Sequence, residues 1–255
     1  IKTMPSSTSS ITYHWHNTSG INIFYREAGP ADAPTLVLLH GYPSSSRMYD
    51  RLIPLLAPQY HVIAPDYPGF GLSDAPTLAD YAYTFDNLAA TMGRFLSGIG
   101  IHRYTLFMQD YGGPVGFRMA MEHPEAISAI IIQNANAYEE GLGEKWKNIA
   151  QYWNDPTGHP EQLDAFISHE GARQRHLGNS PHIERYAPDT WEDEYAMLSR
   201  PGSRDIQAAL FFDYQNNVKS YPLWQEWMRR HQPPALILWG KYDPSFIVPG
   251  AEAYT

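Results

Sequence analysis

Cysteine is absent from this chain of 255 residues. Its absence excludes disulfides, thiolate catalysis and cysteine-ligated zinc sites together. Apolar runs are short: none reaches the roughly 18 residues that a membrane-spanning helix requires, and no signal-peptide pattern opens the chain. Blocks of basic residues are lacking as well, and the net charge of −9 disfavours nucleic acid and anionic membranes as partners. We therefore expect a soluble protein of the cytoplasm.

Motifs that hold a cofactor are also lacking. The glycines of Asp66–Ser73 have neither the lysine nor the spacing of a phosphate-binding P-loop, and no zinc or dinucleotide motif occurs. We expect neither a cofactor nor a bound metal. What the chain does have is apolar bulk, with 43% hydrophobic residues, 18 Tyr and 7 Trp. That content is enough for one sizeable core, and α/β folds of this length often form a single domain.

One stretch of the sequence predicts a reactive side chain. The apolar run Tyr104–Met108 has the composition of a β-strand, and a segment of helical character follows Asp110 as far as Met121. Gly112 and Gly113 come directly after the turn, where strand and helix approach too closely for bulky side chains. A carboxylate at the apex of such a turn can attack carbon and form a covalent ester. Asp110 also has a simpler interpretation, as the N-cap of the helix.

Strands and helices alternate on both sides of this turn. The predicted strands are a hairpin of Ile11–His16 and Ile21–Arg26, then Thr35–His40, Tyr60–Ala64, Ile127–Gln133 and Ala235–Gly240. The predicted helices are Arg47–Ala57 and Phe85–Ile99, and the polar residues Ile1–Ser10 are expected to fray. This order indicates an α/β fold, a mostly parallel twisted sheet flanked by helices. Ligands bind beyond the carboxyl ends of such strands, where Tyr42, Asp110 and Asp243 lie.

A long polar and aromatic segment interrupts the strand order. It runs from about Ala137 to Arg230 and is mostly helical in pattern. An insertion at the ligand face of a sheet acts as a cap that excludes water and shapes the choice of substrate. We therefore predict three parts: a first core part (1–136), a helical cap (137–230) and a second core part (231–255).

Four short motifs occur in order along the chain: His40-Gly-Tyr-Pro43, Asp66-x-x-Gly69-x-Gly71-x-Ser73, Gln109-Asp110-Tyr-Gly-Gly113 and Trp239-Gly-x-x-Asp243. Together they resemble the α/β-hydrolase fold. More narrowly, they are similar to its branch with an aspartate nucleophile, which holds the epoxide hydrolases and the haloalkane dehalogenases. The resemblance covers roughly residue 21 to the end of the chain.

The resemblance implies a role for each motif. Asp110 would attack an electrophilic carbon, and a histidine-activated water would hydrolyse the resulting ester. Asp243 matches the acid that orients this histidine, although an aspartate before a proline is also an ordinary turn residue. The backbone N–H groups of Tyr42 and Tyr111 would hold the oxyanion. His40 would support the loop rather than act as a base.

The histidine that the resemblance implies is missing from its expected place. It should follow Asp243 by about one strand, but the chain ends at Thr255 and has no histidine beyond His231. Either the last strand, the histidine and a terminal helix are absent from the sequence, or the protein lacks its base. We favour the first explanation, because nothing in the pattern after the last predicted strand forms a helix to cover the sheet.

Two tyrosines of the predicted cap are candidates for the general acid. In epoxide hydrolases a pair of cap tyrosines protonates the epoxide oxygen, and the surroundings of Tyr214 and Tyr152 are similar to these two positions. Packing is the alternative role for both. A haloalkane dehalogenase would instead need indole N–H donors, and this chain has Tyr111 and Tyr42 at two of the expected positions, which leaves a cap residue such as Trp153.

The sequence therefore predicts a hydrolase that opens epoxides to diols through an alkyl-enzyme ester on Asp110. The expected partner is a small apolar organic substrate, and the protein is expected to be a monomer or homodimer. A haloalkane dehalogenase is the first alternative. A catalytically incomplete binding protein on the same fold is the second. A serine hydrolase is disfavoured because no serine occupies the turn.

Overall fold

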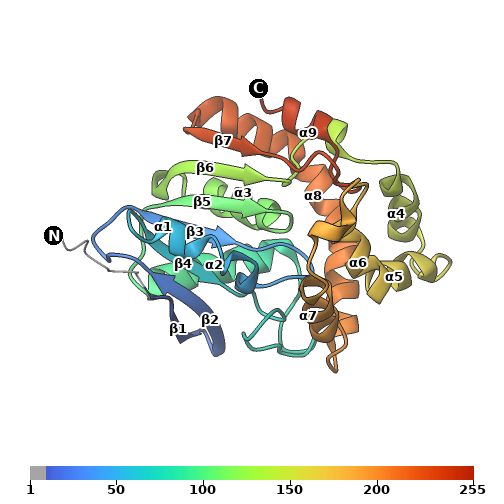
Figure 1. Cartoon of the computed structure of the whole chain (residues 1–255), viewed down its shortest axis with the longest axis horizontal. Coiled ribbons are helices and arrows are strands. Elements are labelled where there is room, and N and C mark those ends of the chain that lie inside the picture. The colour runs from blue at the N-terminus through green and yellow to red at the C-terminus, as the bar shows by residue number, and fades with distance from the viewer. Residues whose placement is uncertain (1–9) are drawn as a thin grey trace.

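Seven strands form one sheet in the order β1-β2-β4-β3-β5-β6-β7 (Figure 1). This computed structural model describes residues 10–255, so the predicted frayed terminus lies outside it except for its last residue. The strands are β1 (Thr12–Thr18), β2 (Ile21–Ala28), β3 (Thr35–Leu39), β4 (His61–Pro65), β5 (Tyr104–Gln109), β6 (Ile127–Gln133) and β7 (Ala235–Leu238). The β1–β2 and β2–β4 pairs are antiparallel and the others are parallel. The predicted hairpin and the mostly parallel sheet are confirmed.

The parallel strands end in register at one edge of the sheet. Leu39 of β3 lies beside Met108 of β5, Gln109 beside Gln133 of β6, and Gln133 beside Leu238 of β7. Each of these strands is followed by a loop at the same edge, as a parallel sheet requires. Residues that are far apart in the sequence are thereby brought together.

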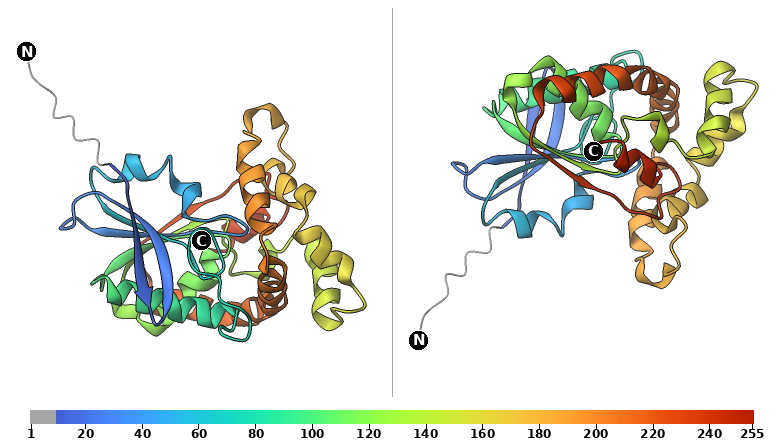
Figure 2. Two further views of the ribbon diagram at one scale, coloured as in Figure 1. Left: turned by 90° about the horizontal axis from the view of Figure 1, so that it is seen from below. Right: turned by 90° about the horizontal axis from the view of Figure 1, so that it is seen from above.

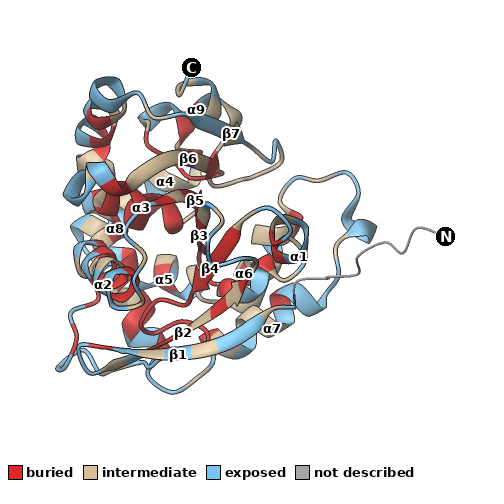
Figure 3. Cartoon of the chain, turned by 90° about the vertical axis from the view of Figure 1, so that its left-hand side faces the viewer, coloured by how far each residue is buried: buried red, intermediate tan, exposed pale blue. Residues whose placement is uncertain are grey.

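Successive side chains of the central strands pack into different layers, as the period of two in a strand dictates. Val37 and Leu39 face the larger core with α2 (Phe85–Gly98) and α3 (Gly112–Glu122). Leu36 and Leu38 face a smaller core. Figure 3 shows the buried stretches gathered at β3 and α3, whereas β1 lies at the exposed margin.

The helix predicted over residues 47–57 is wrong. The chain forms a short 3-10 turn, η1 (Ser46–Tyr49), and then the separate helix α1 (Ile53–Leu56). Pro54 occupies the first turn of α1, where a missing N–H costs nothing. In a continuous helix its ring would collide with the carbonyl of residue 50, so the helix has to restart there.

The segment between β6 and β7 is helical and lies mostly beyond the carboxyl ends of the strands (Figure 1). Figure 2 shows its yellow and orange helices gathered at the end of the molecule opposite the blue hairpin. Its elements are η3 (Glu139–Gly141), α4 (Lys145–Asn154), α5 (Pro160–Phe166), α6 (His169–Leu177), η4 (Ile183–Arg185), α7 (Asp189–Leu198) and α8 (Ser203–His231). One further 3-10 turn, η2 (Pro124–Ala126), precedes β6. A short helix, α9 (Val248–Glu252), follows β7. In residues 10–255 no helix combines the length and apolar character needed to cross a membrane.

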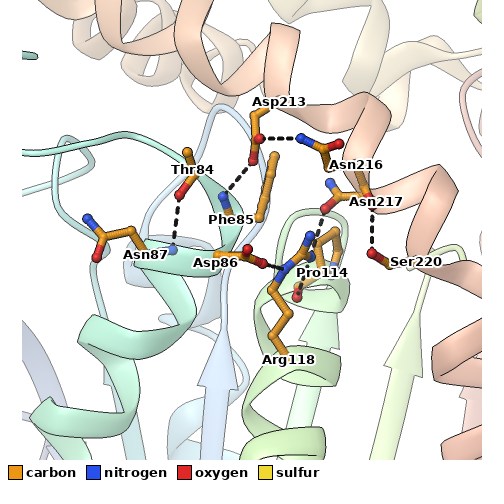
Figure 4. A network of polar contacts seen from close by, with 10 residues as sticks. All are labelled: Thr84, Phe85, Asp86, Asn87, Pro114, Arg118, Asp213, Asn216, Asn217 and Ser220. Atoms are coloured by element: carbon orange, nitrogen blue, oxygen red, sulfur yellow. Dashed lines mark hydrogen bonds and ion pairs between the residues drawn. The ribbon is translucent and has the colours of Figure 1, made fainter.

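The long helix α8 connects this segment to the core. Trp224, near its C-terminal end, stacks on Phe117 of α3 with ring centroids 5.1 Å apart. Arg118 of α3 is bound to Asp86 of α2 and donates to Asn217 of α8 over 2.8 Å (Figure 4). The predicted boundary between cap and second core part, at residue 230, falls in the last turn of this helix.

Candidate active site

Asp110 stands at the turn between β5 and α3 with a backbone φ of +50°. This left-handed conformation is costly for a residue with a side chain, and asparagine and aspartate tolerate it better than most others. Gly112 follows because a Cβ there would lie 2.4 Å from the carbonyl oxygen of Leu39. The predicted strand, tight turn and helix are therefore confirmed, together with the reason for the small residues.

The carboxylate of Asp110 is held by backbone groups of two loops. Its Oδ2 accepts the N–H of Tyr42 over 2.8 Å, and the N–H of Tyr111 also stabilises its charge. A Cβ on Gly41 would lie 2.5 Å from the Asp110 Cβ, so this close approach requires glycine before Tyr42. Asp110 is not the N-cap of α3, because the cap residue is Tyr111 and no side chain caps the helix.

Burial is the main reason that the pKa of Asp110 is raised to about 6. The N–H groups of Tyr42 and Tyr111 and the guanidinium of Arg175 act in the opposite direction, while the charge of Asp243 raises it further. Above this pKa the side chain is an anionic carboxylate shielded from water. Its negative charge is stabilised mainly by the N–H groups of Tyr42 and Tyr111. Such a carboxylate is able to act as a nucleophile.

Asp243 lies in the loop after β7 and lines the same cavity as Asp110. Its Oδ1 accepts the N–H groups of Ser245 and Phe246 over 2.7 and 3.1 Å. Its Oδ2 accepts the side-chain amide of Asn134 over 2.8 Å. The loop therefore fixes Asp243 as firmly as the turn fixes Asp110.

Asn134 is a residue that the sequence analysis missed. It follows β6 with a φ of +44°, and its amide oxygen accepts the Gly240 N–H over 2.8 Å. One side chain thus connects the ends of β6 and β7 and also holds Asp243. The sequence did offer a signal for this role, because Asn134 directly follows the predicted strand Ile127–Gln133. Polar residues at this end of a parallel strand lie at the edge of the sheet where ligands bind.

His40 contacts the loop that carries Tyr42. It is fully buried, its Nδ1 lies 2.9 Å from the Gly41 carbonyl, and its Nε2 accepts the Tyr67 N–H over 3.3 Å. Burial lowers the pKa of His40, which keeps the ring neutral in this arrangement. Its ring stacks on Tyr67 and does not line the cavity.

A cavity of about 90 Å³ brings together five of the seven predicted site residues, all except His40 and Tyr152. The sheet edge and its loops contribute Tyr42, Gln109, Asp110, Tyr111, Asp243, Ser245 and Phe246; the helical segment contributes Lys145, Trp146, Ile149, Phe166, Arg175, Phe211 and Tyr214. No histidine of the described residues lines it. A larger groove, of about 660 Å³, lies between α2 and α3 and contains none of the predicted site residues.

Tyr214 enters this cavity from α8 and its hydroxyl has no hydrogen-bond partner. Burial raises its pKa well above the ordinary value, and the nearby Tyr221 raises it further. The two hydroxyls do not meet the geometry of a hydrogen bond. The ring packs against Trp146, with centroids 4.8 Å apart. The phenol is therefore a neutral donor in contact with the cavity.

Tyr152 does not line the cavity. Its ring packs against Phe211 in a separate apolar cluster. It shares a helix face with Ile149, but it lies one turn farther along α4, beyond the cavity wall. The structure therefore gives no support to the prediction that Tyr152 is a second general acid.

Lys145 and Arg175 are two cationic residues of the cavity wall that sequence patterns did not reveal. Arg175 donates from Nη2 to the Phe166 carbonyl over 2.5 Å, while its Nη1 is shielded from solvent and has no partner. Burial lowers the pKa of Lys145 to about 8; Arg175 acts in the same direction and the two cavity aspartates oppose it. No local motif marks either residue, since their relation to Asp110 arises only from the packing of helices.

Comparison with known proteins places this architecture among hydrolases. A family model described as alpha/beta hydrolase fold matches residues 34–254. An uncharacterized hydrolase of Saccharomyces cerevisiae, YNR064C, is 44% identical over 241 residues, which are 92% of this chain and 82% of the yeast protein. A haloalkane dehalogenase of Mycobacterium marinum is 41% identical over 120 residues, 46% of this chain and 40% of that enzyme.

Solved structures have the same fold at low sequence identity. The epoxide hydrolase CorEH is 20% identical with a TM-score of 0.71, and the match covers 96% of this chain and 95% of that one. A loop variant of the haloalkane dehalogenase DbeA from Bradyrhizobium elkanii is 23% identical with a TM-score of 0.66, covering 95% and 84%. At this identity the similarity establishes the fold and leaves the reaction open.

Proposed function

Because this chain belongs to the α/β-hydrolase fold family, we propose that it is a hydrolase with Asp110 as nucleophile and an epoxide as substrate. The observation that carries this proposal is the pairing of two groups in one cavity: a carboxylate held by backbone N–H groups and the unpartnered hydroxyl of Tyr214. Opening an epoxide needs a nucleophile on carbon and a proton donor on oxygen.

In the first step a carboxylate oxygen of Asp110 forms a bond to an epoxide carbon. The carbon–oxygen bond of the ring breaks, its electron pair goes to the ring oxygen, and Tyr214 supplies the proton. The negative charge of Asp110 passes to the Tyr214 phenolate, which regains its proton from the water that hydrolyses the ester. The Tyr42 N–H already contacts Oδ2, which supports Oδ1 as the attacking atom.

In the second step water attacks the carbonyl carbon of the ester. The negative charge that develops on Oδ2 would be stabilised by the N–H groups of Tyr42 and Tyr111, and collapse of this intermediate releases the diol. The family resemblance assigns the activation of this water to a histidine oriented by Asp243. No histidine of residues 10–255 lines the cavity, so the base of the second step is left unassigned.

The helical segment fits the role of a cap. Half of the cavity wall comes from residues between β6 and β7, and these include the proposed general acid. We infer that the cap comprises α4 to α7 and the N-terminal half of α8, because the C-terminal half of α8 packs on α3.

Haloalkane dehalogenation is the second candidate, since the enzyme from M. marinum is 41% identical over part of the chain. The indole N–H groups weigh against it. Trp153 donates its N–H to the Phe211 carbonyl over 2.9 Å, and Trp146 donates to the Ser245 carbonyl over 2.8 Å. Neither indole is free to bind a departing halide in this arrangement, whereas the Tyr214 hydroxyl has no partner and is available to protonate an epoxide oxygen.

The two candidates are separated by one experiment on the full-length protein. The protein is mixed with small epoxides or with 1-bromoalkanes of similar size, and diol, bromide and the mass of the trypsin peptide containing Asp110 are measured. Diol formation together with an epoxide-sized mass increase on that peptide supports the proposal. Faster bromide release than diol formation contradicts the epoxide assignment, and labelling at another residue contradicts the role of Asp110.

A further inference from the structure

Two basic side chains line the cavity without a part in the proposed reaction. Lys145 comes from the first turn of α4 and Arg175 from the last turn of α6. Both side chains are half-buried, and basic residues are seldom withdrawn from water without an anion nearby. Their presence next to Asp110 therefore calls for a partner.

The two cavity carboxylates act on these cations through charge alone and form no direct ion pair with them. Within residues 10–255 neither Lys145 nor Arg175 forms an ion pair with a carboxylate, whereas their neighbours Lys147 and Arg173 pair with Glu144 and Glu170. The oxygens of Asp110 and Asp243 are instead held by backbone N–H groups and an amide. Arg175 Nη1 and the Lys145 ammonium group are therefore left for a third group.

Arg175 is also fixed in position. Its guanidinium carbon lies 4.7 Å from the ring centroids of both Tyr42 and Phe166, which stack on each other at 4.1 Å. One terminal nitrogen donates to the Phe166 carbonyl, and the other, Nη1, is shielded and unpartnered. A charged donor left unpaired in this way is costly, and a bound anion removes that cost.

We propose that Arg175, assisted by Lys145, binds a carboxylate of the substrate beside Asp110, so that the enzyme acts on short oxirane carboxylates. This inference rests on the proposed function and replaces the apolar substrate expected from the sequence. The guanidinium fork fits carboxylate and phosphate alike, but a cavity of about 90 Å³ favours the smaller group. The aromatic and aliphatic walls contact the carbon skeleton.

The test compares two epoxides of nearly equal size on the full-length protein, glycidate with its carboxylate and glycidamide with a neutral amide. We expect glycidate to have the higher kcat/KM. The variant Arg175→Gln is expected to lower kcat/KM for glycidate roughly 10- to 100-fold, mainly through KM, and to change that for glycidamide by less than about threefold. Lys145→Met is expected to act in the same direction with a smaller effect.

Each variant has a control on the same helix. Arg173→Gln and Lys147→Met remove exposed charges outside the cavity and should leave the ratio of the two substrates unchanged. Arg175→Lys, which keeps the charge and loses the fork, should retain part of the preference. Propionate should inhibit the wild type competitively and Arg175→Gln far less, which is a binding readout independent of turnover.

Three results would overturn the inference or its premise. Equal kcat/KM for the two epoxides, or an equal loss on both in Arg175→Gln, removes the carboxylate subsite and leaves the proposed function standing. No diol from any epoxide, combined with chloride release from 2-chloropropionate that depends on Arg175, removes the epoxide assignment and leaves the subsite. Propionate inhibition that is unchanged in Arg175→Gln contradicts the assignment of Arg175 itself.

Discussion

The two sides of the cavity differ in how their charged groups are satisfied. On the sheet side, Asp110 and Asp243 accept hydrogen bonds from the backbone and from Asn134. On the helical side, Arg175 Nη1 is buried without a partner. The hydroxyls of Tyr214 and, on the sheet side, of Tyr111 are also buried without partners. The two carboxylates are therefore fixed in position largely by hydrogen bonds from the protein backbone. The groups that face them are left free to bind what enters.

This difference has an energetic meaning. An unpartnered buried donor costs about 1–3 kcal/mol, and more when it is charged. The helical side keeps two such donors, and the turn at Asp110 keeps a strained backbone as well. Preorganised sites accept such costs because the donors then need no reorganisation when charge develops on the substrate.

The largest effect is expected on the sheet side, from Asp110→Asn. Asparagine tolerates the positive φ and can keep the hydrogen bond from the Tyr42 N–H, but it has no anionic oxygen. We expect covalent capture of an epoxide to fall by roughly 10⁴-fold or more, measured by the mass of the labelled peptide. Capture at the wild-type rate would mean that the held carboxylate is structural.

The same variant is expected to gain stability. The pKa of Asp110 rises from 3.8 to about 6 on folding, so the folded state favours the protonated form. The stability that this preference contributes is present below pH 3.8 and lost as pH rises through 6. Asp110→Asn should therefore raise the free energy of unfolding by up to about 3 kcal/mol at pH 8 and by little at pH 3.5. Urea unfolding at both pH values measures this, and a gain of equal size at both would exclude the ionisation as its cause.

On the helical side, Tyr214→Phe removes the free hydroxyl and leaves the ring in place. We expect ring opening to slow about 100-fold, because proton donation is lost while packing is kept. Tyr152→Phe is the matched control, since Tyr152 packs outside the cavity and its loss should change the rate by less than about twofold. Stopped-flow fluorescence of the ester-forming step measures both. Equal effects would remove the distinction between the two tyrosines.

The smallest effect is expected from Asn134→Gly. Glycine tolerates the positive φ of this position, so the substitution removes only the side-chain amide. Asp243 would lose one of its hydrogen bonds and Gly240 its connection to β6. We expect ester hydrolysis to slow about tenfold with ester formation unchanged, as single-turnover kinetics can show. An equal loss in both steps would point to a general loosening of the sheet edge.

The sheet side was the part that could be predicted from the sequence. Asp110, Tyr42 and Asp243 each follow an apolar run, and register along the chain is enough to bring strand ends together. Arg175 and Lys145 could not be found in this way, because their positions depend on how α4 and α6 pack over the sheet. Tyr152 shows the same limit. Its local sequence is similar to that of a cap tyrosine in epoxide hydrolases, but it lies one helical turn beyond Ile149 of the cavity wall. The error over residues 47–57 was avoidable, because Pro54 indicates locally that a new helix begins there.

The continuity of α8 has a consequence for how the reaction responds to its surroundings. Tyr214 belongs to the same helix that Arg118 and Trp224 connect to the interior, so the position of its hydroxyl depends on that distant packing. Figure 4 shows the contact of Arg118 with Asn217 of this helix. Asp110 depends on its own turn and on the loop that carries Tyr42, both at the sheet edge. Gentle warming or dilute urea should therefore slow protonation of the epoxide first, so that catalysis fades while the molecule is still folded and the carboxylate is still in its place.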